Sequence, residues 1–556
     1  MTTLQVGDPI KVTVKKYDPS QDSAPYYKTY TVPYTREMRI LEALDYIVEE
    51  LGESLAYQWF CGVKKCGMCG FFVNGRPQLG CWEPVQPEMV IEPLPHFPVI
   101  RDLVIDRGQY VENLLALQPW IQREEPYAGF PEPMTGVQME DAAEMMHCIE
   151  CMMCVSACPT YSSEFVGPAP SVQLARFALD PRDSGPRAQL AKEVGGIEHC
   201  VSCYQCSAAC PTGIPVLQIA IGGLRQQIRD QNLEKPITLR GRAFAHIHTL
   251  SKLGSALAPL SNWLGRLKPV RWLTEKFLGI DQRRQWPTFA SVPFDRWFKS
   301  RKAPARGGQQ VILFHDTFMT YIEPEIGIAT TELLEAAGYE VLLIDGRKCC
   351  GRPMLSQGLE DEARANAEHN VGLLAPYAKR GIPIIGCEPG CLLTIREEYP
   401  TLVPGEDAQV VASQTYTLEE FLAERAVTNG GEPALSFTDE ARELVLHGHC
   451  HQKALVGTGP ALKVLSLPAS YEVAEIPSGC CGMAGSNGFE CEHYERSLQA
   501  AEETLLPAVR EAGADVEIVA AGISCRQQIA HGTGRTARHP ALVLRDALLT
   551  KDQGRR

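Results

Sequence analysis

Residues 148–159 read CIECMMCVSACP, and residues 200–211 read CVSCYQCSAACP. Both stretches have the spacing C-x2-C-x2-C-x3-C followed by proline, which is typical of sequences that hold [4Fe–4S] clusters. When two such runs occur together, the fourth cysteine of each run binds the other cluster. We therefore expect two clusters, one on Cys148, Cys151, Cys154 and Cys210 and one on Cys158, Cys200, Cys203 and Cys206. A pair of zinc sites is the alternative interpretation.

A different cysteine motif lies upstream of these runs. Cys61, Cys66, Cys69 and Cys81 have the spacing C-x4-C-x2-C-x11-C of a plant-type [2Fe–2S] loop. Gly62, Gly67 and Gly70 flank the ligands, where the chain must turn sharply and approach the cluster closely. Residues 10–16 and 26–32 alternate like strands, and residues 37–51 place apolar side chains on one helical face. Together they predict a β-grasp ferredoxin domain, with a zinc loop as the alternative.

Composition agrees with metal-binding cysteines. The chain has 556 residues, which suggests about three or four domains, and 21 cysteines, an odd number that excludes complete pairing. We find no apolar run long enough to span a membrane and no secretory signal, so we expect a cytoplasmic protein. In that reducing compartment, clustered cysteines hold metal more often than they form disulfides. The net charge of −14 argues against a nucleic-acid-binding protein.

The C-terminal half contains an internal repeat. A Tyr-Glu-Val sequence precedes a Cys-Cys-Gly sequence in both copies, at residues 339–351 and 471–482. Apolar strand-like segments (311–314, 341–344, 444–446 and 516–520) alternate with helical stretches, so we expect two α/β lobes. Each copy has four cysteines that suffice for a cluster or for zinc: Cys349, Cys350, Cys387 and Cys391, then Cys450, Cys480, Cys481 and Cys525.

We expect an iron–sulfur cluster in the second copy, with zinc or no metal as alternatives. In the first copy, a metal site and a former site kept for packing both stay open. Cys491 matches no motif position and is predicted to be a buried thiol. On a strand, His447, His449 and His451 would lie on one side and Cys450 on the other; we interpret them as loop histidines near the cluster.

Residues 240–302 differ from the rest of the chain. They contain 13 Lys/Arg against 3 Asp/Glu and four of the seven tryptophans, Trp263, Trp272, Trp286 and Trp297. Leucines between residues 250 and 267 recur at steps of three and four, and Pro259 and Pro269 divide the segment into short helices. Basic, Trp-bearing amphipathic helices can lie in a membrane interface. The alternative is a linker packed on its own domains or on a partner.

Two resemblances to known families add to these interpretations. Residues 8–225 resemble the iron–sulfur subunits of succinate dehydrogenases and fumarate reductases, through the motif from Cys61 to Cys81 and the segments 74–75 and 92–106. Many members lack the second cysteine of the last run and hold a [3Fe–4S] cluster there. This chain has Cys203, so we predict [4Fe–4S].

The C-terminal half resembles the cysteine-rich CCG family, which includes a subunit of heterodisulfide reductases and subunits of anaerobic glycerol-3-phosphate dehydrogenase and glycolate oxidase. Both copies depart from its five-cysteine motif. Thr317 stands at the place of the single cysteine in the first copy, and Gly522 at the first cysteine of the later pair in the second copy. The combination of both regions in one chain resembles the iron–sulfur subunits of thiol:fumarate reductases.

These resemblances imply an α+β multidomain chain: a β-grasp [2Fe–2S] ferredoxin (1–110), an α-helical double-cluster domain (111–235), the basic linker (236–305) and two α/β CCG lobes (306–430 and 431–556). They imply an electron-transfer subunit that connects a FAD-containing flavoprotein to a quinone or a thiol/disulfide couple. From the basic linker itself, we expect a peripheral position on the inner face of the cell membrane, through contact of residues 240–302 with the membrane surface or with a membrane subunit. No residue set for catalysis on an organic acid is found. A different flavoprotein partner, for a 2-hydroxyacid or glycerol-3-phosphate, and a stand-alone electron carrier are the alternatives.

Overall fold

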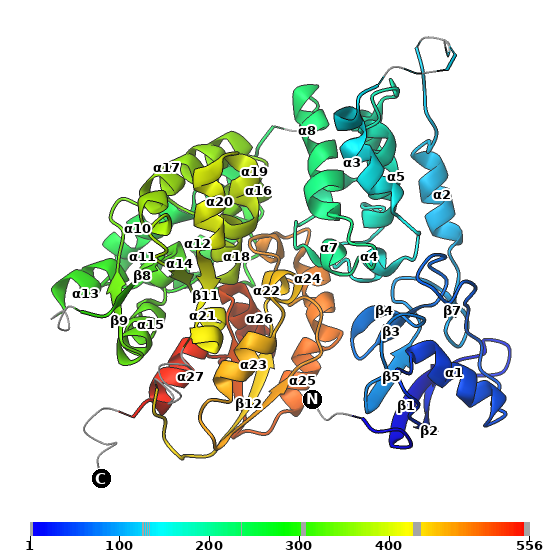
Figure 1. Ribbon diagram of the computed structural model, residues 1–556. Coiled ribbons are helices and arrows are strands. Elements are labelled where there is room, and N and C mark those ends of the chain that lie inside the picture. Colours follow the sequence, from blue (N-terminus) through cyan, green and yellow to red (C-terminus); the bar gives the residue numbers. More distant parts are fainter. Residues whose placement is uncertain are drawn as a thin grey trace. The chain divides into compact units, whose positions relative to one another are not determined.

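The computed structural model describes residues 4–301 apart from 125–126, 128, 131, 133 and 235, and then residues 307–425 and 435–549. Residue contacts divide the chain into two compact units, Met1–Lys235 and Pro236–Arg556 (Figure 1). Each unit mixes helices and strands. Within the described residues, no helix combines the length and the apolar character that crossing a bilayer requires.

The first unit begins with a five-stranded sheet in the order β2-β1-β5-β3-β4. Its strands are β1 Pro9–Lys16, β2 Tyr26–Pro33, β3 Gly70–Val73, β4 Arg76–Leu79 and β5 Glu88–Glu92. Strand β1 pairs antiparallel with β2 and parallel with β5. Ile10, Val12 and Val14 alternate into the core, as the sequence pattern predicts for a strand with one buried face.

Helix α1 (Ile40–Glu49) buries Ile40, Leu44 and Ile47 in the same core. The helix was predicted over residues 37–51 and begins three residues later. The reason is local, because Glu37 has a positive φ of 60° and Arg39 is extended at the N-cap.

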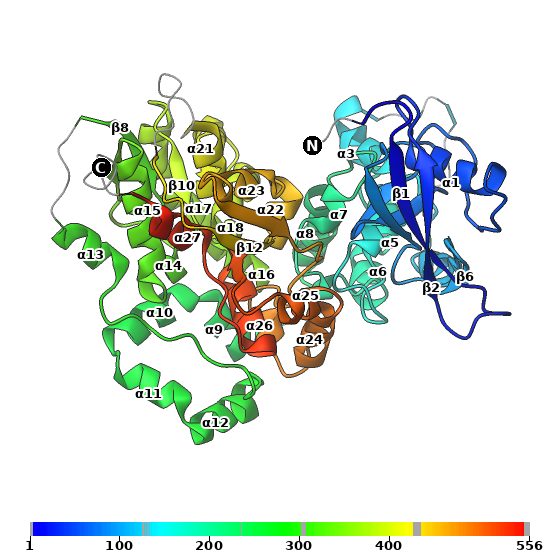
Figure 2. The same ribbon diagram turned by 90° about the horizontal axis from the view of Figure 1, so that it is seen from below.

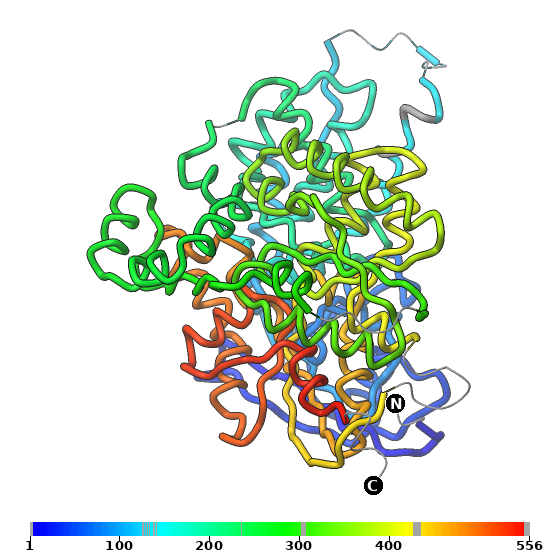
Figure 3. Tube along the Cα trace, turned by 90° about the vertical axis from the view of Figure 1, so that its left-hand side faces the viewer, coloured from blue at the N-terminus to red at the C-terminus, as the bar shows by residue number. Residues whose placement is uncertain are grey.

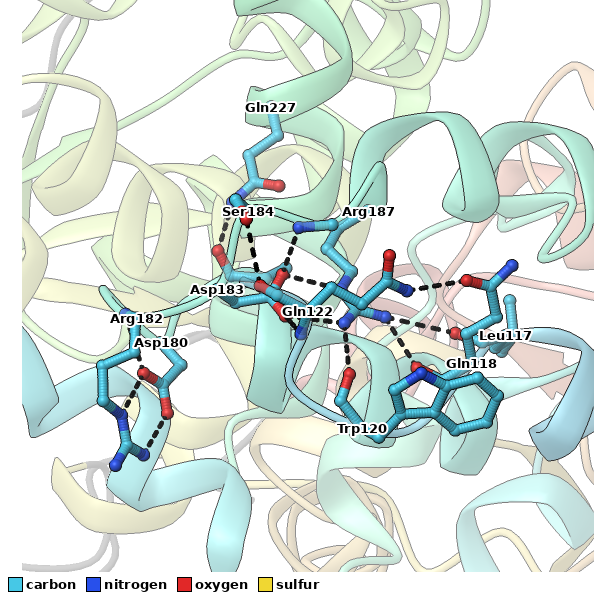
Figure 4. A network of polar contacts seen from close by, with 12 residues as sticks. Leu117, Gln118, Trp120, Gln122, Asp180, Arg182, Asp183, Ser184, Arg187 and Gln227 are labelled. Atoms are coloured by element: carbon cyan, nitrogen blue, oxygen red, sulfur yellow. Dashed lines mark hydrogen bonds and ion pairs between the residues drawn. The ribbon is translucent and has the colours of Figure 1, made fainter. Parts of the chain in front are cut away.

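The second half of this unit is mostly helical. It contains β6 Val99–Arg101, β7 Val104–Ile105, α2 Gly108–Ala116, α3 Gly136–Met146, α4 Met153–Ser156, α5 Pro168–Ala178, α6 Arg187–Glu193, α7 Gln205–Ala208 and α8 Gly222–Asp230, with a 3-10 turn at Ile197–His199 and a π-helical turn at Val216–Ile221. The buried Arg187 guanidinium pairs with Asp183 and donates to the carbonyls of Gln118 and Trp120 (Figure 4). This network fixes the chain after α2 against the start of α6.

The described residues of the second unit form two parallel sheets. One has the order β11-β10-β8-β9 and the other β13-β12-β14. The strands are β8 Gln309–Leu313, β9 Tyr339–Leu342, β10 Ile384–Gly386, β11 Thr415–Thr417, β12 Arg442–His447, β13 Tyr471–Glu475 and β14 Glu517–Ala520. The four predicted strand segments are confirmed within a few residues. The two sheets share one apolar core. It contains Val311 of β8 together with Leu333, and Leu444 of β12 together with Val464.

Helices surround these sheets. They are α14 Thr317–Tyr321, α15 Pro324–Ala336, α16 Arg352–Ser356, α17 Glu360–Ala378, α18 Pro389–Leu393, α19 Tyr399–Leu402, α20 Glu406–Ser413 and α21 Leu418–Arg425 for the first lobe, and α22 Cys450–Leu455, α23 Gly459–Leu465, α24 Tyr494–Glu502, α25 Leu505–Glu511, α26 Ile523–Thr533 and α27 Pro540–Ala547 for the second, with a π-helical turn at Thr394–Glu398 and a 3-10 turn at Asn487–Phe489. Helix α27 packs on α15, so the last helix closes back on the first lobe.

Up to residue 301, where its described part ends, the basic linker forms five short helices: α9 Leu239–Ala245, α10 Ile247–Ala256, α11 Leu260–Arg266, α12 Lys268–Leu278 and α13 Phe294–Ser300. As predicted, Pro259 and Pro269 mark the starts of α11 and α12. Neither of these two helices buries a side chain within the described structure. They project away from the rest of the second unit (Figures 2 and 3).

Candidate metal centres

The loop that carries Cys61, Cys66 and Cys69 offers amide N–H groups to sulfur. The Sγ of Cys61 accepts from the N–H groups of Val63 at 3.4 Å, Lys65 at 3.2 Å and Cys66 at 3.3 Å. These backbone donors lower the pKa of Cys61 to about 7. Since thiolates rather than thiols bind iron, the loop stabilises the state that a [2Fe–2S] cluster needs. The residues present therefore fit that cluster.

The same loop lies directly against the first C-x2-C-x2-C-x3-C run, at residues 148–158 (the first ferredoxin-type run). A Cβ added at Gly67 would lie 2.4 Å from the Ile149 carbonyl oxygen and 2.9 Å from the Cys151 Cα. Arg107 links the two segments, because its guanidinium donates to the carbonyls of Glu150 and Gly67 at 3.1 and 3.3 Å. The two predicted cluster sites are thus neighbours within the first unit.

The two C-x2-C-x2-C-x3-C runs adopt the same backbone conformation. Glu150 and Met152 have positive φ angles in the first run, and Ser202 and Tyr204 have them at the matching positions of the second. A four-residue helix follows in each case, α4 and α7, and the two helices pack together. The two runs therefore share one backbone shape, as the identical spacing of their cysteines predicts.

The thiols of the two runs are neighbours in a crossed pattern. Burial, followed by the nearby Cys200 thiol, raises the pKa of Cys158 to about 11. Burial also raises the pKa of Cys148, and Cys210 contributes to the shift. Thus Cys158 lies within electrostatic range of the second run, and Cys210 within electrostatic range of the first.

In the first CCG lobe, three of the four predicted cysteines lie in one apolar cluster, Cys349, Cys350 and Cys391. Hydrogen bonding to Cys350 and burial raise the pKa of Cys349. Cys387 lies in the other apolar core, and its Sγ is 3.1 Å from the Thr330 hydroxyl. Metal binding by the four-thiol set stays a prediction.

A cavity of about 390 Å³ lies beside Cys349. His246, His248 and Thr249 at the start of α10 line one part of it, and Arg347 and Met354 another. Thr317, which stands where the CCG motif has its single cysteine, is 2.9 Å from the Nδ1 of His248. Burial, followed by the charge of Arg347, lowers the pKa of His248 to about 4, so the imidazole is neutral at pH 7. No sequence pattern predicted this cavity, because its walls come from segments about 100 residues apart.

In the second CCG lobe, all four predicted cysteines are close together. The thiols of Cys450 and Cys481 both hydrogen-bond to Cys480, and the pKa of Cys480 is lowered well below its usual value by these bonds. Cys481 in turn hydrogen-bonds to Cys525. The donor set therefore fits a metal centre, by its thiol content and by its spacing.

The three histidines around Cys450 were interpreted as loop histidines, and they lie instead on three different parts of the chain: a strand end, a helix cap and a helix. Strand β12 ends at His447, and α22 begins at Cys450 with His449 as its N-cap. The Nδ1 of His449 accepts from the His451 N–H at 3.2 Å. A Cβ at Gly522 would lie 2.3 Å from the His449 ring, so this ring fills the place of the motif's missing cysteine.

Cys491 corrects a further prediction. We expected a buried thiol, and the structure shows a partly exposed one. Its backbone N–H donates to the Gly279 carbonyl at 3.0 Å, beside the end of α12. Position in the sequence could not show this, because the residue packs against the linker rather than inside its lobe.

Comparisons with known proteins agree with a [2Fe–2S] region, a [4Fe–4S] region and a CCG region in this chain. A 2Fe-2S iron-sulfur cluster binding domain matches residues 11–112, a 4Fe-4S dicluster domain residues 144–214, and a cysteine-rich domain residues 312–396. A subunit of the anaerobic glycerol-3-phosphate dehydrogenase of Escherichia coli K12 is 30% identical over 72% of this chain and 98% of its own length. The fumarate reductase iron-sulfur subunit of Haemophilus influenzae is 37% identical over 36% of this chain and 86% of its own length. The chain belongs to this family of iron–sulfur electron-transfer subunits.

Another relative extends across both halves. A subunit of the fumarate reductase (CoM/CoB) of Methanothermobacter marburgensis is 27% identical over 86% of each chain. As a member of the family, the chain has the [2Fe–2S], [4Fe–4S] and CCG regions that its motifs predict. The cysteine spacing did not point to Arg107 or Arg347, which the fold brings to the cluster loop and to the cavity.

Proposed function

We propose that the chain is the electron-transfer subunit of a complex of the fumarate reductase or succinate dehydrogenase type. It passes electrons between a FAD-containing catalytic subunit and a membrane quinone. A [2Fe–2S] cluster on Cys61, Cys66, Cys69 and Cys81 and two [4Fe–4S] clusters carry the electrons. The crossed electrostatic effects, of Cys210 on Cys148 and of Cys200 on Cys158, support the assignment of the ligands. One [4Fe–4S] cluster takes Cys148, Cys151, Cys154 and Cys210, and the other takes Cys158, Cys200, Cys203 and Cys206.

The contact between the [2Fe–2S] loop and the first run supports an electron path inside the first unit. Gly67 allows the loop backbone to touch Cys151, and Arg107 holds both segments. Bound clusters supply one-electron redox chemistry. The protein sets their potentials through sulfur hydrogen bonds such as those to Cys61, through burial and through nearby charge.

The observation that carries the quinone assignment is the cavity beside Cys349. Its volume of about 390 Å³ suits a small aromatic ring system. A quinone has two carbonyl oxygens that need hydrogen-bond donors, more strongly as the ring is reduced. Arg347 supplies a cation there. Neutral His248 accepts at Nδ1 from Arg347 at 3.5 Å, so its remaining N–H donor is at Nε2.

The exposed face of α10 to α12 supports a membrane as the source of the quinone. Trp263, Leu257 and Phe277 are 58%, 60% and 73% exposed. Basic side chains at positions 266, 268, 271 and 276 accompany them. Apolar and cationic groups on short helices suit the interface of an anionic lipid surface. The same segment contributes His246 and His248 to the cavity, so the proposed membrane face and quinone site share one element.

Arg347→Gln tests the quinone site in the purified complex. We expect quinol-driven cluster reduction by a water-soluble menaquinol analogue to fall about tenfold, while cluster reduction by dithionite is unchanged. Arg380→Gln is the matched control, because Arg380 lies on the same lobe and packs on Tyr377 outside the cavity. Equal rates for the two variants would contradict the site. Faster reduction by a dithiol than by the quinol, lost in the same variant, would favour the thiol/disulfide alternative.

Liposome flotation tests the membrane face separately. A Trp263→Gln/Phe277→Gln double variant should lose binding to vesicles with anionic lipid at low salt. Trp120→Gln changes a similarly exposed tryptophan in the first unit and should bind as the wild type does. If the unaltered complex ignores these vesicles, the lipid-binding role is wrong.

Similarity to the glycerol-3-phosphate dehydrogenase subunit supports a second candidate partner, the flavoprotein of an enzyme of that kind. The match covers 98% of that subunit but 72% of this chain, so this chain contains a region that the relative does not match. The [2Fe–2S] domain at residues 11–112 favours a partner of the fumarate reductase type, because the resemblance to fumarate reductase iron–sulfur subunits includes the motif from Cys61 to Cys81. Co-purification identifies the flavoprotein, and a chain that purifies without any flavoprotein would favour a free-standing carrier.

A further inference from the structure

His447 is a buried histidine that the proposed electron path does not use. It ends β12, and its side chain is 1% exposed. The Nδ1 lies 2.7 Å from the Ser478 hydroxyl. Among the described residues, the Nε2 has no hydrogen-bond partner. Leaving a buried polar nitrogen without a partner destabilises the folded chain, so a ligand at Nε2 would explain why it is retained.

The neighbours of His447 indicate what this ligand is. A ring nitrogen of His447 and the Sγ atoms of Cys481 and Cys525 all lie within 4.8 Å of one another. In a tetrahedral zinc site, with Zn–S near 2.3 Å and Zn–N near 2.0 Å, ligand atoms are separated by about 3.5–3.8 Å. Small movements therefore bring all three atoms onto one ion.

The hydrogen bond to Ser478 sets the tautomer that ligation requires. The Lys453 ammonium donates to both the carbonyl and the hydroxyl oxygen of Ser478. This leaves Ser478 placed as an acceptor for the His447 Nδ1–H. With the proton on Nδ1, the Nε2 lone pair is free for a metal. A histidine ligand oriented by a hydrogen bond at its other nitrogen is the usual arrangement in metal sites.

The distances between ligand atoms distinguish this site from the predicted cluster sites of the first unit. In a four-iron cluster each thiolate binds a different iron atom, so the sulfurs stand apart. Across the described part of the chain, no three cysteines of either ferredoxin-type run come within 4.8 Å of one another. The second lobe is more compact, and Cys480 adds a fourth sulfur through its contact with Cys481.

We propose that His447, Cys480, Cys481 and Cys525 hold a single tetrahedral zinc ion with mixed imidazole and thiolate ligands. The second lobe then contains a structural ion in place of an additional iron–sulfur cluster. This inference does not depend on the quinone site. Thiolates and a neutral imidazole are ligands that zinc prefers. His449 is not a ligand, because its Nδ1 already accepts from a backbone N–H and its Nε2 carries the proton.

Metal analysis of the full chain tests the proposal. Protein purified without oxygen and dialysed against a chelator should contain about one zinc and about ten irons per chain. His447→Ala should lower zinc about tenfold or more and leave iron unchanged. His447→Cys should restore zinc, because it replaces one ligand by another. This rescue separates ligand loss from misfolding.

His449→Asn is the matched control, since asparagine also caps a helix and the neighbouring ring is removed. We expect it to keep the zinc. X-ray absorption at the zinc edge should show one nitrogen and three sulfur neighbours in the wild type and four sulfurs in His447→Cys. The proposal is overturned if the wild type contains no zinc. It is also overturned if His449→Asn loses the zinc while His447→Ala keeps it. About four irons beyond ten would identify a cluster instead.

Discussion

Gly67→Ala is the sharpest perturbation of the electron path. Gly67 has φ +69°, a conformation that costs an alanine about 1–2 kcal/mol. The new Cβ would also lie 2.4 Å from the Ile149 carbonyl oxygen and 2.9 Å from the Cys151 Cα, both backbone atoms. Overpacking of this kind costs about 1–3 kcal/mol. The sum is about 2–5 kcal/mol, which the chain can lower by moving the [2Fe–2S] loop away from the first run.

Low-temperature EPR of the reduced chain measures this separation. The [2Fe–2S] signal should relax more slowly in Gly67→Ala, because its magnetic coupling to the nearest [4Fe–4S] cluster weakens with distance. The unfolding midpoint in urea should fall as well. Gly62→Ala is the matched control, with φ +67° and only the edge of Trp59 at 3.9 Å. Equal relaxation and equal stability in the two variants would refute the close approach of loop and run.

Three further changes test other parts of the structure. Cys203→Ala should convert one [4Fe–4S] cluster into a three-iron form, seen as an EPR signal in the oxidised chain and the loss of about one iron; an unchanged spectrum would contradict the ligand assignment. Arg187→Met leaves Asp183 buried without its partner and should cost about 3–5 kcal/mol in urea unfolding, whereas Arg182→Met breaks a more exposed pair and should cost about 1 kcal/mol. Burial raises the pKa of Glu419 to about 7, so the wild type should lose up to about 3 kcal/mol of stability as pH rises from 4.5 through 7; Glu419→Gln should lack this loss, and parallel pH curves would show that the carboxyl is not protonated in the folded chain.

The cysteine motifs of the first half were predictable because ligand spacing is a local property. Three ligands on one short loop must be close whatever surrounds them, so Cys61, Cys66 and Cys69 could be found from spacing alone. The strands around them follow from alternation of buried residues such as Ile10 and Val12.

The CCG half was less predictable because its donors meet only in the folded lobes. The spacing groups Cys387 with Cys391, yet the fold directs Cys387 to Thr330 in another core. His447 was interpreted as a loop histidine, and only the position of Ser478 and Cys525 shows its orphaned nitrogen. The sequence predicted amphipathic helices in the linker. It could not predict that their apolar face is exposed, because that depends on how the folded lobes pack against the linker.

The most direct test of the central claim is a redox-titrated EPR spectrum of the anaerobically purified full chain, with iron counted in the same sample. A chain that carries electrons through one [2Fe–2S] and two [4Fe–4S] clusters should contain about ten irons. It should show one [2Fe–2S] signal and two interacting [4Fe–4S] signals on reduction, and no three-iron signal when oxidised. An oxidised three-iron signal, or the absence of one of the three reduced clusters, would contradict the account.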